Sequence, residues 1–195
     1  MEYPLELTFK LLAIAQQISV VDARGQMVFY VKQKAFKLKE AVTAFADQTQ
    51  QTPLYTINAN KVLDFSARYN FAEASGRPLG SVRRRGMRSI WKARYEVYDE
   101  REQLQMTINE ESAWTKVLDA LVGEIPVVGM FTGYMFHPAY LVTRTNGTVV
   151  MRLEKRPAFF QGKFLITKNG DLPPEEETRA ILSLLMTVLL ERRRG

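Results

Sequence analysis

An eleven-residue run near the C-terminal end, Ala180–Leu190, constrains the fold of this chain more than any other segment. It reads AILSLLMTVLL, and nine of its eleven residues are apolar. The two exceptions, Ser183 and Thr187, lie four positions apart and therefore share one narrow stripe of a helix. A helix that is apolar in nearly every other direction must be surrounded on all sides.

The surroundings of this helix are predicted to be protein rather than a bilayer, because a membrane-spanning helix needs about 20 apolar residues. Glu175–Glu177 precede the run, and Glu191 with Arg192–Arg194 follows it. Pro174 and the three acids suit the start of a helix, and the arginines suit the negative end of its dipole. We therefore expect a buried helix over about 174–193, in which the two hydroxyl groups bond to carbonyls one turn earlier.

From about Ile18 to Ile108 the sequence alternates with a period of two, which is typical of β-strands. The pattern is organised as hairpin units, each with an acidic residue entering the turn. Two units match at a spacing of 26 residues, and such a spacing indicates one supersecondary unit used several times. The expected strand pairs are Ile18–Asp22 with Met27–Val31, Thr43–Asp47 with Pro53–Ile57, Ala67–Glu73 with Pro78–Val82, and Ala93–Asp99 with Leu104–Ile108.

Four acidic residues at these turns are Asp22, Asp47, Glu73 and Asp99. A short carboxylate at a turn accepts hydrogen bonds from backbone N–H groups about two residues further on. We therefore interpret the four acids as turn residues rather than as catalytic or metal-binding groups.

The second half of the chain continues the hairpin pattern around two segments of different character. An Asn-Gly turn joins the predicted strands Ala139–Thr143 and Val149–Leu153, and Lys163–Thr167 adds another strand. Ser112–Val122 has helical spacing of its apolar residues and is expected to form a helical insertion over about 112–122. Ile125–Phe136 is apolar with two glycines, which fits either a buried strand pair or an exposed apolar loop.

The number of strands favours a closed sheet, because closure removes the two exposed edges. A barrel of about 12 strands is too wide for its own side chains to fill. The apolar C-terminal helix is a suitable filler, whereas a helix laid across one face of an open sheet would keep one side in water. We predict a mainly β fold and a single domain over residues 1–195, a closed antiparallel barrel around a central hydrophobic helix.

Three stretches carry a family resemblance: Val31–Leu38, which reads VKQKAFKL; Ala93–Asp99, which reads ARYEVYD; and Phe164–Thr167, followed by a loop containing Asp171 and by the apolar run. Through them, over roughly residues 5–190, the chain resembles the tubby C-terminal-like superfamily, and most closely its LURP-one-related group of small single-domain proteins. The resemblance implies a barrel around a central hydrophobic helix, in agreement with the prediction from the residues alone.

The resemblance also implies a role at membranes. Tubby domains bind phosphoinositides through basic residues on the barrel exterior, and phospholipid scramblases look similar. This chain differs from the scramblases in having no cysteine, no Pro-rich N-terminal region and no acidic calcium-binding loop before its C-terminal helix. No lipid-binding residue is therefore carried over from these relatives position by position.

Basic clusters are the best candidates for a functional site in a chain of net charge +6. An outward row of basic side chains attracts anionic lipid, at about 1 kcal/mol per residue near a charged membrane surface. The lysines of the first cluster all face outward only if a bulge near Ala35 resets the register, and the other interpretation is an edge strand protected by lysine. The predicted lipid-binding residues are Lys32, Lys34, Lys37, Lys39, Arg83, Arg84, Arg85 and Arg88.

Catalytic and metal-binding hypotheses find little support in the sequence. The chain has no cysteine and one histidine, His137, which excludes Cys–His pairs and multi-histidine metal sites. We expect this histidine to be structural or incidental rather than catalytic or metal-binding. Walker and G-x-G-x-x-G motifs are also missing from the sequence, so no catalytic residue, metal site or cofactor is predicted.

The expected function is that of a non-enzymatic module that binds anionic phospholipid head groups or tethers a partner at a membrane surface. The alternative is a protein-interaction or small-ligand scaffold that uses Ile125–Phe136 as an exposed patch. Binding of single-stranded nucleic acid by Arg83–Arg88 with Trp91, Arg94 and Tyr95 is a weaker hypothesis, because alternation places both aromatic rings in the core. No secretory signal is visible, so the expected location is cytoplasmic or peripheral at a membrane.

Overall fold

The structure is a computed structural model that describes residues 1–10, 15–34, 42–60, 67–85, 94–111, 139–158 and 161–192. The predicted helical insertion at 112–122, the apolar segment Ile125–Phe136 and His137 lie outside these residues. Twelve strands and the helix α2 (Pro174–Arg192) are found in the described part of the chain. The strands are β1 (Leu5–Lys10), β2 (Ala15–Val21), β3 (Met27–Lys34), β4 (Val42–Phe45), β5 (Pro53–Ala59), β6 (Arg68–Glu73), β7 (Pro78–Arg85), β8 (Arg94–Tyr98), β9 (Leu104–Glu110), β10 (Ala139–Arg144), β11 (Val149–Arg156) and β12 (Gln161–Lys168).

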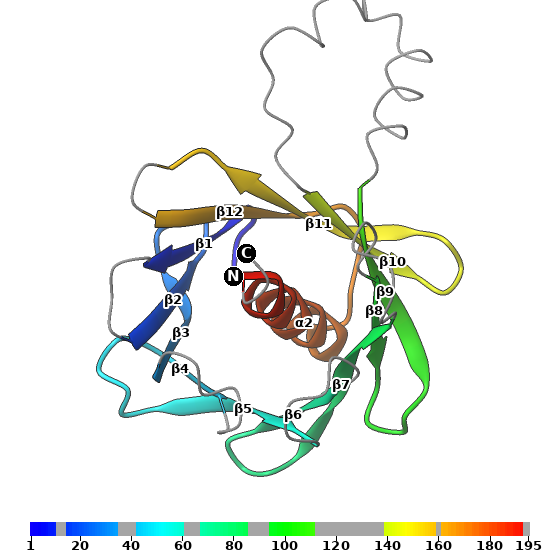
Figure 1. Ribbon diagram of the computed structural model, residues 1–195, viewed down its shortest axis with the longest axis horizontal. Helices are drawn as coiled ribbons and strands as arrows, with labels where there is room; N and C mark the ends of the chain where they lie inside the picture. Colours follow the sequence, from blue (N-terminus) through cyan, green and yellow to red (C-terminus); the bar gives the residue numbers. More distant parts are fainter. Residues whose placement is uncertain are drawn as a thin grey trace, which may run out of the picture.

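The strands form one closed antiparallel barrel in which each strand pairs with its neighbours in the sequence (Figure 1). This confirms the predicted fold class. Strand β1 was not predicted from the sequence; it pairs with β2 on one side and with β12 on the other and thereby closes the barrel. Its alternating side chains Leu5, Leu7 and Phe9 are at most 1% exposed.

The acidic turn residues lie where they were predicted, with one variation in their bonding. The carboxylates of Asp22, Asp47 and Asp99 accept hydrogen bonds of 2.8–3.0 Å from backbone N–H groups two or four positions further on. The longer side chain of Glu73 accepts guanidinium bonds from Arg77 instead. Local chemistry therefore sets these turns, as a carboxylate at a turn entrance predicts.

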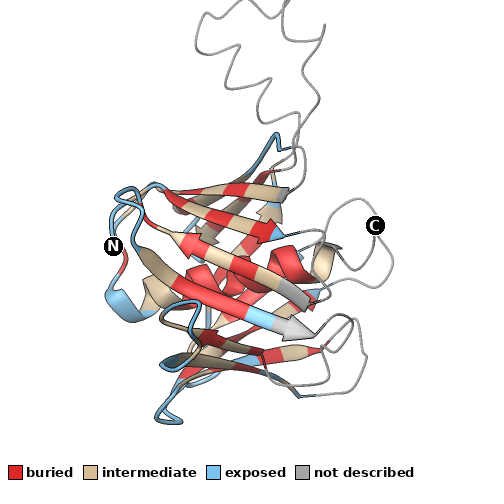
Figure 2. Ribbon diagram, turned by 90° about the vertical axis from the view of Figure 1, so that its left-hand side faces the viewer, coloured by how far each residue is buried: buried red, intermediate tan, exposed pale blue. Residues whose placement is uncertain are grey.

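Helix α2 lies inside the barrel and forms its core (Figure 1). Every residue from Arg179 to Leu189 is buried, and Figure 2 shows this burial between the strands. The hydroxyl groups of Ser183 and Thr187 donate to the carbonyls of the residues four positions earlier, at 2.8 and 2.9 Å. Since both hydroxyl groups are paired, they do not oppose burial. The helix is thus surrounded by protein, and the open-sheet alternative is wrong.

The strands nearest to α2 are β7 and β8. β7 carries arginine side chains on both faces of the barrel wall, and β8 carries one, Arg94, on the outer face. Among the described residues, no helix is long and apolar enough to cross a membrane.

Candidate functional site

The structure describes only part of the predicted basic site. Lys32 is exposed on β3, where pairing with β4 is limited to Tyr30 and Val31. Protection of a poorly paired strand by lysine therefore remains a sufficient explanation for this residue. The described side chains do not include four of the predicted residues: Lys34, Lys37, Lys39 and Arg88.

The run Arg83–Arg85 does not form one cluster, because alternation along β7 sends its side chains to opposite faces. Val82 faces the core and is 0% exposed, and Arg84, two positions later, is only 5% exposed. Arg83 and Arg85 point outward, and Arg85 is exposed. The hypothesis that all three arginines face a lipid surface is therefore corrected: Arg84 is an interior residue.

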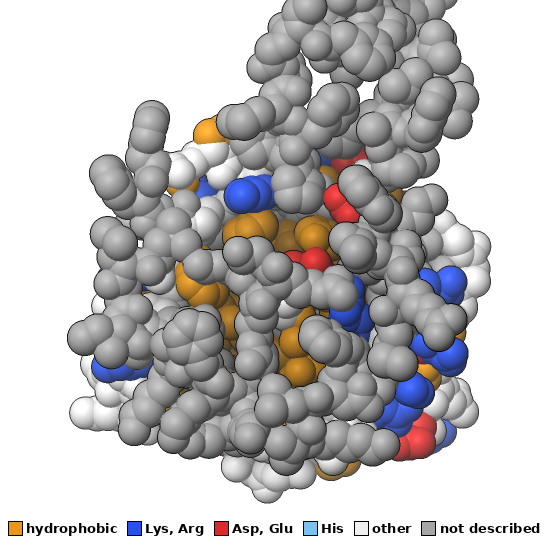
Figure 3. All heavy atoms as spheres, in the orientation of Figure 1, with side chains coloured by type: hydrophobic (Ala, Val, Ile, Leu, Met, Phe, Trp, Pro, Cys, Tyr) orange, Lys and Arg blue, Asp and Glu red, His pale blue; other side chains and the backbone are white. Residues whose placement is uncertain are grey.

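Outward arginines from three neighbouring strands form a group that we call the arginine patch: Arg68 on β6, Arg83 and Arg85 on β7, and Arg94 on β8. Arg68 pairs in register with Arg83, and Arg85 pairs in register with Arg94. Figure 3 shows Lys and Arg side chains gathered along the right-hand side of the barrel, where Figure 1 draws β7, β8 and β9. Sequence analysis did not assign Arg68 and Arg94 to the site. The 26-residue repeat could have indicated them, because it aligns Arg68 with Arg94 on the two strands that flank β7.

Glu96 lies within the arginine patch and neutralises part of its charge. The guanidinium of Arg85 contacts its carboxylate at 2.8 Å, and the Tyr98 hydroxyl donates to the same carboxylate at 2.6 Å. Burial acts to raise the pKa of Glu96, but these two bonds and the positive charges of the patch outweigh it and hold that pKa below its usual value. Glu96 is therefore a fixed negative charge at neutral pH.

The remaining members of the patch differ in their pairing. Arg68 forms an ion pair of 2.8 Å with Glu102 and lies 4.6 Å from the centre of the Tyr98 ring. In contrast, no ion pair joins Arg83 or Arg94 to any residue that the structure describes. The patch therefore keeps a net positive charge on the outer wall of the barrel.

A second polar group, which we call the mouth cluster, lies at the barrel end that receives the C-terminal end of α2: Arg84, Tyr95, Glu110, Tyr140 and Glu191. The Tyr95 hydroxyl donates to Glu191 Oε1 at 2.5 Å. The Arg84 Nε atom lies 3.7 Å from the same oxygen. Burial, together with the negative charge of Glu191, raises the pKa of both tyrosines and of Glu110.

The opposite end of α2 is held by ion pairs to the strands. The three acids of its first turn were interpreted as a helix start, and each also contacts a basic side chain of the wall. Glu175 pairs with Arg77 at 2.6 Å, Glu176 with Arg144 at 2.8 Å, and Glu177 with Lys168 at 3.1 Å.

Arg179 completes this docking from one turn further along the helix. Its Nε atom donates to the Leu79 carbonyl, and its Nη2 atom contacts Glu100 at 3.2 Å. Gly80 makes the approach possible: its φ is +122°, and a Cβ atom there would collide with the Tyr98 carbonyl and lie 2.8 Å from Arg179 Nε.

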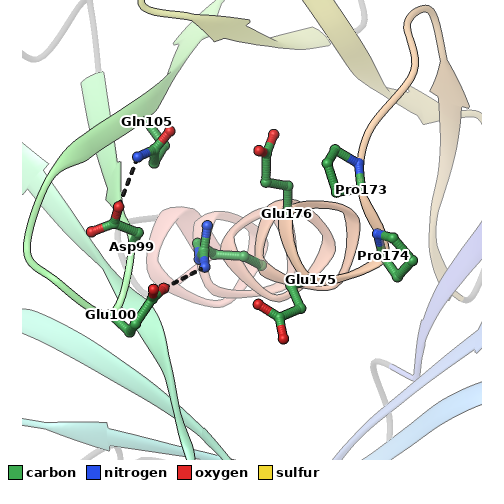
Figure 4. A pocket seen from close by; sticks show the side chains of 8 residues that line it. Asp99, Glu100, Gln105, Pro173, Pro174, Glu175 and Glu176 are labelled. Carbon is green, nitrogen blue, oxygen red and sulfur yellow. Dashed lines mark hydrogen bonds and ion pairs between the residues drawn. The ribbon is translucent and has the colours of Figure 1, made fainter.

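A pocket of about 280 Å³ lies at this end, lined by Asp99, Glu100, Glu175 and Glu176 together with Arg179 (Figure 4). The figure shows the first two acids coming from the β8–β9 turn and the other two from the helix. Within the described part of the chain, no group of three His, Cys, Asp or Glu side chains is arranged to hold a metal ion. Ion pairs to basic residues occupy Glu100, Glu175 and Glu176, so the pocket is a docking site for the helix rather than a cation site.

Comparison with known proteins places this geometry among related barrels. The model of a family described as LURP-one-related matches residues 27–169. Among solved structures, the X-ray structure of a protein from Arabidopsis thaliana matches with a TM-score of 0.50 and 13% sequence identity, over 95% of this chain and 91% of that chain. At this identity the match supports the fold alone. No curated protein matches the chain in sequence.

Proposed function

The chain belongs to the LURP-one-related family, and from this premise we propose that its barrel binds anionic phospholipid head groups at a membrane surface. The proposed contact is the arginine patch on the outer wall. The part of the chain that matches the family, residues 27–169, includes all three strands of this patch.

The observation that carries the proposal is the pair Arg83 and Arg94, two guanidinium groups without an ion pair to any described residue. A basic residue near an anionic bilayer contributes about 1 kcal/mol, so these two side chains would contribute about 2 kcal/mol. Binding of this kind is weak and depends on salt, because the groups are exposed to solvent and screened by ions. Such a contact suits reversible attachment at a membrane surface.

Lipid head groups are a better match to the patch than single-stranded nucleic acid. Binding of single strands relies on aromatic rings on which the bases stack. Tyr95 is 0% exposed inside the barrel and is not available for stacking, while Trp91 lies outside the described residues. The segment Ile125–Phe136, on which a protein-interaction scaffold would depend, also lies outside them.

Vesicle co-sedimentation tests this proposal. The probes are vesicles of phosphatidylcholine alone and of phosphatidylcholine with phosphatidylglycerol or a phosphoinositide, at low and at high salt. We expect binding to the anionic vesicles at low salt and its loss at about 0.5 M salt, where the Debye length falls to a few ångströms. The double variant Arg83→Gln/Arg94→Gln should bind about 30-fold more weakly, which corresponds to the loss of about 2 kcal/mol.

A matched control removes the same charge elsewhere. Arg24 and Lys155 are both exposed and lie outside the arginine patch, so Arg24→Gln/Lys155→Gln also lowers the net charge by two. We expect this control to bind almost as well as the unchanged protein. Failure of the unchanged protein to sediment with anionic vesicles at low salt would contradict the proposal, and so would an equal loss in the patch variant and the control.

A further inference from the structure

Arg84 carries two buried hydrogen-bond donors that have no acceptor. The residue is 5% exposed, and neither Nε nor Nη2 has a hydrogen-bond partner among the residues that the structure describes. Buried donors of a charged group are costly to leave unpaired, which makes such a pair rare in a folded protein. Arg179, the other buried arginine among the described residues, has its Nε atom bonded to a carbonyl and its Nη2 atom in contact with Glu100.

The nearest acid does not fill this position. Glu191 Oε1 lies 3.7 Å from Arg84 Nε, beyond hydrogen-bond distance, and the same oxygen accepts the Tyr95 hydroxyl at 2.5 Å. Glu191 therefore balances the charge of Arg84 without accepting its two N–H groups. No described residue accepts a hydrogen bond from Arg84 Nε or Nη2.

The two free nitrogen atoms define the shape of a suitable acceptor. Nε–H and one N–H of Nη2 lie side by side along one edge of the planar guanidinium and point in the same direction. This edge binds two oxygens of one carboxylate or one phosphate at the same time. A single carbonyl or hydroxyl oxygen placed between the two donors would accept both bonds only at bent angles, so it fits this edge less well.

The charges around Arg84 favour an acceptor with a single negative charge. Glu191 is already present, and burial together with its charge raises the pKa of the neighbouring Glu110. A doubly charged phosphate would add two negative charges beside these acids, whereas a carboxylate adds one. A carboxylate is also planar, like the guanidinium. The Tyr140 hydroxyl, whose pKa is raised by burial and by both acids, stays protonated beside the site.

We propose that the barrel mouth is a carboxylate-binding site, in which Arg84 Nε and Nη2 donate to the two oxygens of the ligand. This site is separate from the arginine patch, because Arg84 points into the barrel while Arg83 and Arg85 point out. The carboxylate belongs either to a small free acid or to the head group of an amphiphile, for which the half-buried Leu190 offers an apolar contact at the same end of the helix.

NMR of the arginine Nε–H groups in the unchanged protein tests the site directly. The probes are acetate as a free carboxylate, decanoate as an amphiphile, and inorganic phosphate. We expect the Arg84 Nε–H resonance to shift with one or both carboxylates and to saturate at a ligand concentration below about 50 mM. The Arg179 Nε–H resonance should not shift. Equal affinities for acetate and decanoate would identify a free carboxylate as the ligand, and affinity at least about tenfold higher for decanoate would identify an amphiphile.

Two variants distinguish the paired N–H donors of Arg84 from its positive charge. Arg84→Lys keeps the charge but loses the paired donors, so carboxylate affinity should fall at least about tenfold, measured as ligand-dependent stabilisation against heat. Arg83→Lys, one position away on the outer face, should change the affinity by less than about twofold. The inference is overturned if the Arg84 Nε–H resonance does not respond to either carboxylate, if phosphate binds more tightly than both, or if Arg84→Lys binds as well as Arg83→Lys. Should Arg84→Lys fail to fold, the titration of the unchanged protein decides.

Discussion

The two ends of helix α2 lie in the same barrel but differ in how their charged groups are matched. At the N-terminal end, three consecutive acids each contact a basic side chain of the wall, and Arg179 reaches a backbone carbonyl and Glu100. At the C-terminal end, Glu191 accepts a tyrosine hydroxyl, while two donors of Arg84 have no described partner. The named charged groups at the N-terminal end are thus paired within the described residues, whereas two donors of Arg84 at the C-terminal end are not.

The two ends therefore use their buried arginines differently. A buried arginine with its donors paired stabilises the docked helix, because removing it leaves the partner groups unsatisfied. A buried arginine with free donors does not contribute in this way and is retained at some cost to stability. The first arrangement is typical of structure and the second of binding. Three substitutions test this difference between the two ends of the helix.

The largest effect is expected in the middle of the helix, which connects the two ends. Leu185→Asp places an unpaired carboxylate at a position that is 0% exposed, and we expect a loss of more than about 4 kcal/mol in the free energy of unfolding. Urea denaturation followed by circular dichroism measures it. The control Leu190→Asp lies at the half-buried C-terminal end and should cost less than half as much. A folded Leu185→Asp variant of near-normal stability would show that the two ends are not joined by one buried helix.

The next largest effect is expected at the N-terminal end. Arg179→Met removes both nitrogen contacts and leaves the Leu79 carbonyl and Glu100 without their partner, so we expect a cost of about 3 kcal/mol. Arg77→Met is the control, since it breaks ion pairs at the same end of the helix but in solvent, where such pairs contribute little. Equal losses in the two variants would contradict the structural role given to Arg179.

The smallest effect is expected for the matching change at the C-terminal end. Arg84→Met removes a buried charge whose Nε and Nη2 donors have no described acceptor, but it also leaves Glu191, 3.7 Å away, without its counter-charge. The loss in unfolding free energy in carboxylate-free buffer should therefore be smaller than that of Arg179→Met, at most about 2 kcal/mol. Parallel urea titrations of Arg84→Met and Arg179→Met compare the two ends directly. A loss as large as that of Arg179→Met would mean that the donors of Arg84 are satisfied within the folded chain.

Most of the fold could be predicted because its determinants are local. Alternating side chains and turn acids such as Asp22 and Asp99 specify hairpins over about ten residues, and the composition of Ala180–Leu190 specifies a surrounded helix. Strand β1 was missed although Leu5, Leu7 and Phe9 alternate in the same way. One of its two partners, β12, is distant in the sequence, so no local pattern indicates the pairing that closes the barrel.

The polar sites were harder to predict because they depend on register and on distant contacts. Three consecutive arginines look alike in the sequence, and only their alternation with buried Val82 separates Arg84 from its neighbours. The acceptor of Arg179 is a backbone carbonyl 100 positions away, which no side-chain pattern reveals. The arginine patch is similar, since it brings together side chains from three strands.

The pairing of Leu5 with Ile166 also determines the order of events when the chain folds. Hairpins between sequence neighbours can form early, whereas this last seam joins residues about 160 positions apart, and pairing over such a distance is slow. Helix α2 follows β12 in the chain, so closure of the barrel and packing of its core helix are completed together in the final step. Until then the apolar inner surfaces of the hairpins are open to other chains, and folding competes with aggregation.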